Sequence, residues 1–146
     1  DCFAPGRMPV FIFEEDGGRF FYGIPDVGHG VKVARTHGGA MVNPDKVKRT
    51  VTKEDTEPVE SFVSKRLPKL GREPIASTTC LYTNTPDLNF AVGPLPNDPR
   101  VAVVSACSGH GFKFAGVLGE VVGDLLTGGR SRYDVSFLRL DRFAKT

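Results

Sequence analysis

"RVAVVSACSGHGFKFAGVLGEVVGDLL", residues 100–126, decides the fold that this sequence predicts. Its first eight residues are mostly small and β-branched, which is typical of a strand buried on both faces. Gly109 and Gly111 follow, and apolar residues then recur at helical spacing until Gly128. This pattern predicts a strand, a glycine turn and a helix, the unit that binds phosphate-bearing cofactors in α/β folds. The buried side of the helix is expected to comprise Phe114, Val117, Leu118, Val121, Val122 and Leu125.

The glycine turn is open to two interpretations. Gly109 and Gly111 match the first two glycines of a dinucleotide-binding fingerprint, but Phe114 occupies the third position and no acidic ribose ligand follows. The spacing alone therefore favours an ordinary tight turn. Lys113 points the other way, because the positive end of the helix dipole disfavours a cation in the first turn. An anion such as a carboxylate would account for a lysine at that place.

The first forty residues predict an antiparallel sheet. β-Prone runs at 9–13 and 19–24 flank Asp16-Gly17, a strong hairpin signal. Residues 30–34 add a third strand bounded by glycines.

The middle of the chain predicts a surface helix. Thr56 or Asp55 is expected to cap it, Pro58 to fall in its first turn, and Pro68 to stop it. Its buried residues are expected to be Val59, Phe62, Val63 and Leu67.

Three further strands are expected. Residues 74–85 are rich in β-branched and aromatic side chains, and residues 89–93 are their expected hairpin partner. A closing strand is expected over 134–140.

Composition excludes several classes of protein. The 146 residues are 40% hydrophobic and 25% charged, values typical of one globular domain. A net charge of +2 with scattered basic residues does not indicate nucleic-acid binding.

No apolar run has the length of a membrane span and no signal segment opens the chain, so we expect a soluble, cytoplasmic protein. Because the chain begins at Asp1 and its first residues are typical of mid-protein sequence, we expect a trimmed protein or a piece of a longer one.

The cysteines and histidines, taken singly, predict no metal site. Cys2, Cys80 and Cys107 contain no C-x-x-C pair and are too few for a disulfide framework, which indicates a reducing compartment. Cys80 lies within a predicted strand, where a cysteine is most often a small buried hydrophobe. His29, His37 and His110 are not clustered, and structural roles are expected for each.

Two segments together resemble a known family. "CLYTNTPD" (80–87) and "SGHGFKF" (108–114) are similar to the C-x-Y-T-x-T-x-D and S-G-H-G-F-K-F segments of the monomeric sarcosine oxidase and N-methyltryptophan oxidase family. These flavoproteins belong to the larger D-amino-acid-oxidase-like group. The interval from Cys80 to Lys113 fits the family without a gap, and "YGIPDVGHGVKVA" (22–34) resembles a third family segment. The resemblance extends from about residue 9 to residue 143.

The resemblance implies how the cofactor is held. Cys80 matches the cysteine that forms a thioether to the 8α-methyl group of FAD. Gly109, His110, Gly111 and Phe112 match the turn that packs on the flavin.

The resemblance also implies the substrate contacts. Tyr22 and Tyr82 match tyrosines of the substrate pocket, and Lys113 matches the lysine that pairs with the substrate carboxylate. Lys32 matches a lysine held near the flavin through water, where its charge favours oxygen reduction. His37 stands one residue beyond the position of the family's histidine, which Thr36 occupies in this sequence.

The resemblance further implies an α+β chain that is an incomplete fold. Residues 1–98 would form part of an antiparallel substrate-binding domain, including the Cys80 strand, and residues 99–146 the final strand and helix of an FAD-binding α/β domain. The family's G-x-G-x-x-G turn, its acidic ribose ligand and an N-terminal arginine have no counterpart here. A missing N-terminal FAD-binding portion is therefore an expected partner.

The function that follows is that of an enzyme fragment. The parent would oxidise a secondary amine such as an N-methyl amino acid, giving an imine and hydrogen peroxide, and the lone chain would be inactive. The alternative is a non-catalytic module that keeps the oxidase scaffold and binds a partner or itself. Such a module would need a neighbour, in a homo-oligomer for example, because a doubly buried strand without adjacent strands leaves apolar surface exposed.

Overall fold

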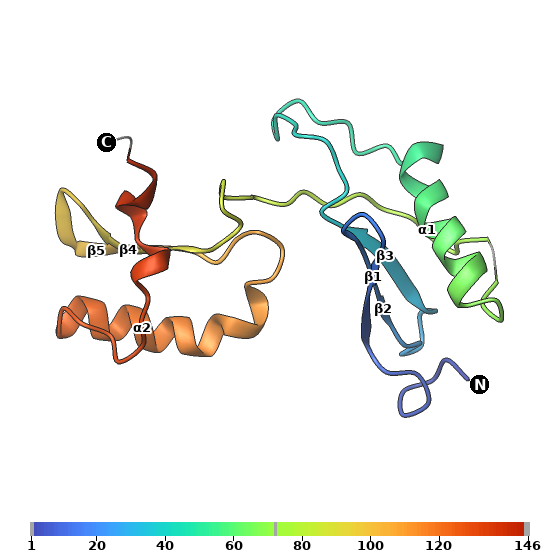
Figure 1. Ribbon diagram of the computed structural model, residues 1–146, viewed down its shortest axis with the longest axis horizontal. Coiled ribbons are helices and arrows are strands. Elements are labelled where there is room, and N and C mark those ends of the chain that lie inside the picture. The colour runs from blue at the N-terminus through green and yellow to red at the C-terminus, as the bar shows by residue number, and fades with distance from the viewer. Residues whose placement is uncertain (1, 72, 145–146) are drawn as a thin grey trace. The chain divides into compact units, whose positions relative to one another are not determined.

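The computed structural model describes residues 2–71 and 73–144, and the chain divides into two compact units, Asp1–Leu81 and Tyr82–Thr146 (Figure 1). Within the described residues each unit carries one antiparallel sheet and one α-helix, so the fold is mixed α+β as the sequence predicts. The predicted boundary between residues 98 and 99 falls inside the sheet of the second unit. The assignment of the two regions to substrate and flavin domains stays a prediction.

The first unit contains the predicted three-stranded sheet. β1 (Phe11–Glu15), β2 (Arg19–Ile24) and β3 (Lys32–Thr36) lie in the order β1-β2-β3, and both pairs are antiparallel. The hairpin is confirmed, and β3 begins two residues later than the predicted strand. Gly30 is outside the ladder because its φ is +87° and its N–H donates to Oδ1 of Asp26 at 2.9 Å.

Helix α1 (Lys53–Arg66) begins earlier than the sequence predicts. Its N-cap is Thr52, so the expected cap at Thr56 or Asp55 is wrong. Asp55 instead occupies the third helical position, where one carboxylate oxygen accepts hydrogen bonds from the N–H and the hydroxyl of Thr52, each at 2.9 Å. This reciprocal arrangement is a capping box, and it places Pro58 inside the helix rather than in its first turn.

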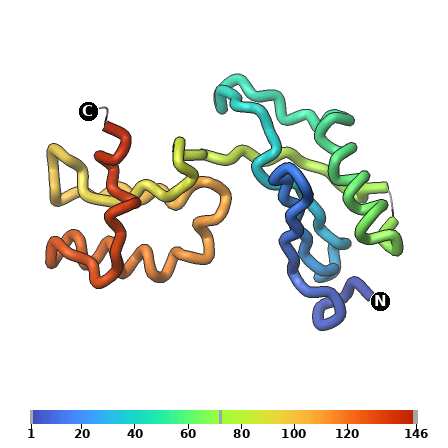
Figure 2. Tube along the Cα trace, viewed as in Figure 1, coloured from blue at the N-terminus to red at the C-terminus, as the bar shows by residue number. Residues whose placement is uncertain are grey.

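Helix α1 packs against the sheet of the first unit through Phe62 and Val63. Phe62 and Phe21 are both 2% exposed, and their rings stack with centroids 4.5 Å apart. Phe11 and Phe13 add further ring contacts to Phe62. Before the helix, residues 37–52 run from β3 to α1 without strand or helix (Figure 2). Helix α1 therefore closes the core over β1 and β2 through the ring of Phe62, which contacts aromatic rings of both strands.

The second unit is built on a hairpin that the sequence analysis assigned wrongly. β4 (Ala91–Leu95) pairs antiparallel with β5 (Asp98–Ser105), with Val92 opposite Val104. The expected strand over 74–85, which was to contain Cys80, does not form, and 89–93 does not pair with it. The backbone of that segment is engaged elsewhere, since the carbonyl of Thr83 accepts the N–H of Ser108 at 2.7 Å.

Strand β5 differs from its prediction in burial. The apolar run predicts burial on both faces, but Val101 and Val104 are 44% and 47% exposed. Among the described strands β5 pairs only with β4, so one of its edges has no neighbouring strand and these side chains are only partly covered. The prediction is wrong for this chain because burial on both faces needs neighbours that the described residues do not supply.

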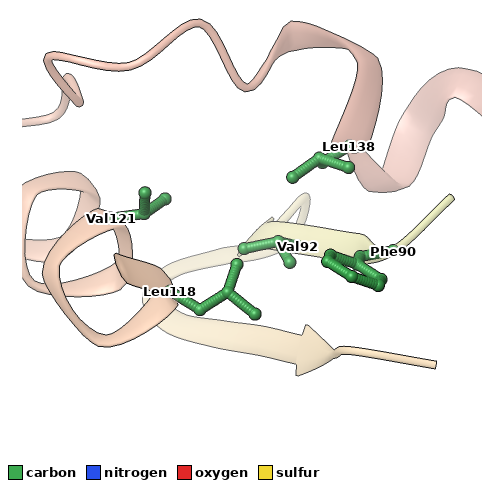
Figure 3. Close-up of a cluster of buried hydrophobic side chains, with 5 residues drawn as sticks. All are labelled: Phe90, Val92, Leu118, Val121 and Leu138. Atoms are coloured by element: carbon green, nitrogen blue, oxygen red, sulfur yellow. The ribbon is translucent and has the colours of Figure 1, made fainter. Parts of the chain in front are cut away.

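The predicted second helix is confirmed as η1 (Phe112–Phe114) followed by α2 (Ala115–Thr127). Leu118 and Val121 of α2 are buried with Phe90, Val92 and Leu138 in one core cluster (Figure 3). Phe114 lies outside this core at 37% exposure, because it belongs to the tighter η1 turn.

The expected closing strand over 134–140 does not form. Two 3₁₀ turns replace it, η2 (Ser136–Leu138) and η3 (Leu140–Phe143). The carboxylate of Asp134 accepts the N–H of Ser136 at 3.0 Å and so starts the first turn. Among the described residues, neither α-helix combines the length and apolar character that crossing a bilayer requires.

Candidate functional site

The turn between β5 and α2 has a backbone shape that glycine makes accessible. Ser108 and Gly109 have φ values of +61° and +76°, in the left-handed region. A Cβ at Gly111 would lie about 2.0 Å from the carbonyl oxygen of Ala106, so only glycine fits where the chain doubles back. Ser108 is fully buried at the centre of the turn. The turn is therefore a rigid, tightly packed start to the η1–α2 segment.

The segment after Cys80 lies against this turn. The N–H of Ser108 donates to the carbonyl of Thr83 at 2.7 Å, and the N–H of Thr85 lies 3.4 Å from the Ser108 hydroxyl. A Cβ placed at Gly109 would be 3.2 Å from the ring of Tyr82. Within the second unit, the structure thus brings residues 82–85 of the first quoted segment against the glycine turn of the second.

Residues 85–89 form a compact turn next to this contact. The hydroxyl of Thr85 donates to the carbonyl of Asn89 at 2.5 Å, and Oδ1 of Asp87 accepts the N–H of Asn89 at 3.1 Å. The guanidinium of Arg142 forms a bidentate pair with Asp87, at 2.8 and 3.1 Å. Hydrogen bonds from Arg142 hold the pKa of the Asp87 carboxyl well below its usual range.

His110, Phe112 and Lys113 extend from the glycine turn. Nδ1 of His110 lies 2.9 Å from the carbonyl oxygen of Ser108, and its ring centroid is 4.8 Å from that of Phe90. These contacts hold the imidazole against the turn and against Phe90. Phe112 is 98% exposed, and the ammonium of Lys113 is 5.4 Å from the ring centroid of Phe114. The lysine therefore lies at the exposed beginning of the helical segment, where its charge is accessible to an anion.

The three cysteines are free thiols in different surroundings. Cys80 is exposed, so the expectation that it is a buried hydrophobe in a strand is wrong, and it lies two residues before Tyr82. Cys107 is half-buried, which alone would raise the pKa of its thiol. Hydrogen bonds that involve Ser108 and Ser105 outweigh this effect and lower that pKa.

The other expected site residues lie in the first unit. Tyr22 on β2 pairs with Ala34, and Lys32 lies diagonally across at the start of β3. This places the Lys32 ammonium 5.3 Å from the centroid of the Tyr22 ring, a cation–π distance. His37 follows β3 directly with a φ of +54°. The structure thus brings Tyr22 and Lys32 together in one unit, and Tyr82 and Gly109 together in the other.

The sequence analysis missed the residues that fix the site segment. Thr85 and Asp87 lie inside the quoted motif, but nothing in the sequence indicates that their partners are Ser108 and Arg142. Asp87 and Arg142 are 55 residues apart in the chain, and the local periodicity of a sequence does not reveal contacts at such a separation. In the described part of the chain, no three side chains of the metal-binding types gather into a possible metal site.

The sequence match to a known family shows that the chain is of the flavin-dependent oxidoreductase class. Residues 2–125 match the family described as FAD dependent oxidoreductase, and the chain belongs to that family.

Two relatives in particular show which members the chain is similar to. It is 34% identical to the monomeric sarcosine oxidase of Streptomyces avermitilis, covering 97% of this chain and 38% of that enzyme. It is 33% identical to the N-methyl-L-tryptophan oxidase of Salmonella dublin, covering 95% of this chain and 38% of that enzyme. The chain therefore spans less than two-fifths of these relatives and corresponds to their C-terminal portion.

A solved structure agrees on the fold. NikD, an amino acid oxidase essential for nikkomycin biosynthesis, superposes in its open form with a TM-score of 0.57 at 20% identity. The match covers 82% of this chain and 33% of NikD. At this identity the likeness shows the fold alone.

Proposed function

We propose that the chain is the C-terminal portion of an oxidase that acts on N-methyl or other secondary amino acids. The observation that carries this proposal is the packing of the segment after Cys80 against the turn at Gly109. Sarcosine and N-methyl-L-tryptophan, the compounds in the names of two relatives, are both N-methyl amino acids, which supports this substrate class. The overall reaction converts the amine and oxygen into an imine and hydrogen peroxide, and water then hydrolyses the imine.

The described residues fit the ring end of FAD. Cys80 presents an exposed thiol for a covalent thioether, and Gly109 leaves exposed backbone without a side chain beside Tyr82. When bound, FAD accepts two electrons from the substrate and passes them to oxygen. Because the sequence contains no G-x-G-x-x-G turn, we assign the ADP end of FAD to an N-terminal portion of a longer protein. Residues 1–98 then contribute to the substrate-binding domain and residues 99–146 to the FAD-binding domain.

Charge at the beginning of the η1–α2 segment orients the substrate. Lys113 is exposed there, and both its ammonium and the helix N-terminus favour an anion, so we assign it to the substrate carboxylate. In the second unit, Tyr82 is assigned to contact with the substrate. In the first unit, Tyr22 is assigned to substrate contact as well, and the adjacent Lys32 to stabilising negative charge that develops on oxygen as it is reduced. His37 is assigned to the same group at the end of β3.

The flavin linkage is tested on the complete protein that carries this chain. After acid denaturation, flavin fluorescence is expected to remain with the polypeptide in the unmodified protein and in a Cys2→Ser variant, and to be lost in Cys80→Ser. Cys2 is a suitable control because it is also an exposed free thiol. A Cys80→Ser variant that keeps its flavin through denaturation would contradict the linkage.

The role of Lys113 is tested by steady-state kinetics on the same protein. Losing a hydrogen bond to a charged group costs about 1.5–3 kcal/mol, so Lys113→Met should raise KM for an N-methyl amino acid by about tenfold to a hundredfold. Lys65→Met, on the exposed side of α1, is the matched control and should leave KM unchanged. An unchanged KM in Lys113→Met would remove the carboxylate assignment.

One observation favours the alternative of a non-catalytic module. An apolar hollow of about 630 Å³ lies between β5 and α2, lined by residues that include Val104, Phe112, Ala115 and Gly119. A partner or a second copy of the chain seated there would cover exposed apolar surface. If the complete protein is colourless and holds no flavin, either covalently or non-covalently, that result would support this alternative over the oxidase.

A further inference from the structure

The side chain of Arg142 joins three stretches of the second unit. Nε and Nη2 of its guanidinium donate to the two carboxylate oxygens of Asp87, and Nη2 also donates to the carbonyl of Phe90 at 2.8 Å. Nη1 donates to the carbonyls of Leu138 and Arg139, each at 2.8 Å. The Arg142 side chain is only 15% exposed. One planar guanidinium therefore ties the turn over 85–89 to the start of β4 and to the closing 3₁₀ segment.

Asp87 transmits this restraint to its own turn. Its Oδ1 atom accepts the N–H of Asn89 at 3.1 Å, while the carbonyl of Asn89 accepts the hydroxyl of Thr85. Leu88, between them, has a φ of +60° and donates its N–H to the carbonyl of Thr85 at 3.1 Å. A non-glycine residue in the left-handed region persists when the surrounding bonds impose it.

The restraint continues from Thr85 into the candidate site. The backbone N–H and the hydroxyl of Thr85 both lie 3.4 Å from the hydroxyl of buried Ser108. Two residues before Thr85, the carbonyl of Thr83 accepts the N–H of Ser108, and Tyr82 lies against Gly109. A contiguous path of hydrogen bonds and packing thus runs from Arg142 through Asp87 and Thr85 to the place where Tyr82 meets the glycine turn.

We propose that Arg142 is a positioning residue that fixes the Tyr82 ring against Gly109 through Asp87 and Thr85. The inference rests on the proposed function only in treating Tyr82 and the glycine turn as the wall of the substrate and flavin pocket. Lysine does not replace arginine here, because an ammonium cannot hold a carboxylate in a fork and also reach carbonyls on both sides. The neighbouring Arg139 provides a contrast, since it pairs with Asp141 two residues away and its side chain is 65% exposed.

The test follows Tyr82 directly by ¹⁹F NMR of the chain labelled with 3-fluorotyrosine. The sequence has three tyrosines, at 22, 82 and 133, and single Tyr→Phe variants assign the three signals. Arg142→Lys should shift or broaden the Tyr82 signal by more than its linewidth and leave that of Tyr22 unchanged. Arg139→Lys, the matched control, should leave Tyr82 where it is.

A comparison of single and double substitutions tests whether Arg142 acts on Tyr82 through Asp87. Asp87→Asn should move the Tyr82 signal in the same direction, and Asp87→Asn with Arg142→Lys should move it no further than the larger single effect. An unmoved Tyr82 signal in Arg142→Lys overturns the proposal, as do additive shifts. Collapse of both single variants to the signal of free fluorotyrosine also overturns it, because Arg142 is then needed for folding alone. No flavin takes part, so failure of the flavin linkage and failure of this inference are separate results.

Discussion

Replacing Gly109 with alanine tests the contact that defines the candidate site. Gly109 has a φ of +76°, and an added Cβ would lie 3.2 Å from two atoms of the Tyr82 ring. Gly129 is the matched control, with a φ of +70° and nothing within 4 Å of an added Cβ. Alanine therefore carries the same free-energy cost of a left-handed backbone at both positions, but only at position 109 does its Cβ meet a neighbouring side chain.

The size of each effect follows from these two terms. Holding alanine in the left-handed region costs about 1–2 kcal/mol, and the lower entropy of the unfolded alanine chain offsets about 0.4–1 kcal/mol of this. Gly129→Ala should thus lower the free energy of unfolding by roughly 1 kcal/mol. Gly109→Ala should lower it by about 1 kcal/mol more, because crowding a packed site costs about 1–3 kcal/mol and the Tyr82 ring can yield by a few tenths of an ångström.

Urea unfolding of the two variants measures this difference, and the fluorine signal of Tyr82 reports whether the ring moves. The signal should shift in Gly109→Ala and stay in place in Gly129→Ala. Equal losses of stability in the two variants, with an unmoved Tyr82 signal, would refute the reasoning that Tyr82 packs on the glycine turn.

Two other predictions concern the core and the acid side of the stability profile. Phe62→Ala should lower the free energy of unfolding by about 3–5 kcal/mol, since the ring is 2% exposed and stacks on Phe21; a loss below 1 kcal/mol in urea unfolding would contradict this core. Asp87 has a folded-state pKa below its unfolded value of 3.8, so its contribution to stability is present above that value and is lost as pH falls below it. Between about pH 4 and pH 2, a range that brackets the unfolded pKa, the unmodified chain should therefore lose more stability than Asp87→Asn. Thermal unfolding measures this loss. Parallel stability profiles of the two proteins would argue against the pair with Arg142.

The elements that the sequence predicts correctly are those whose signals are local. The β1–β2 hairpin follows from its Asp-Gly turn between two aromatic runs, and α2 follows from apolar residues at helical spacing. Helix α1 is predicted in type, but its start is missed because Thr52 lies outside the apolar pattern and its partner is Asp55.

The errors concentrate where side chains far apart in sequence determine the conformation. Residues 74–85 have the composition of a strand, yet Thr83 and Thr85 bond to Ser108, more than twenty residues away. The closing segment is short and amphipathic, and Leu138 joins the core from a 3₁₀ turn rather than from a strand. Motif resemblance located the candidate site residues, whereas the network that holds them is visible only in three dimensions.

The irregular course of the Tyr82–Asp87 segment has a consequence for how the proposed substrate pocket would change over evolutionary time. A strand in this place would couple every residue to a backbone ladder, so a new pocket shape would disturb the sheet. Here a few hydrogen bonds, at Thr83, Thr85 and Asp87, carry the attachment. Asn84 and Pro86, which alternate with these three residues, are exposed. Positions of this kind can accept new side chains while the anchors stay, which makes the loop a natural region for diversifying or engineering the substrate preference of the proposed oxidase.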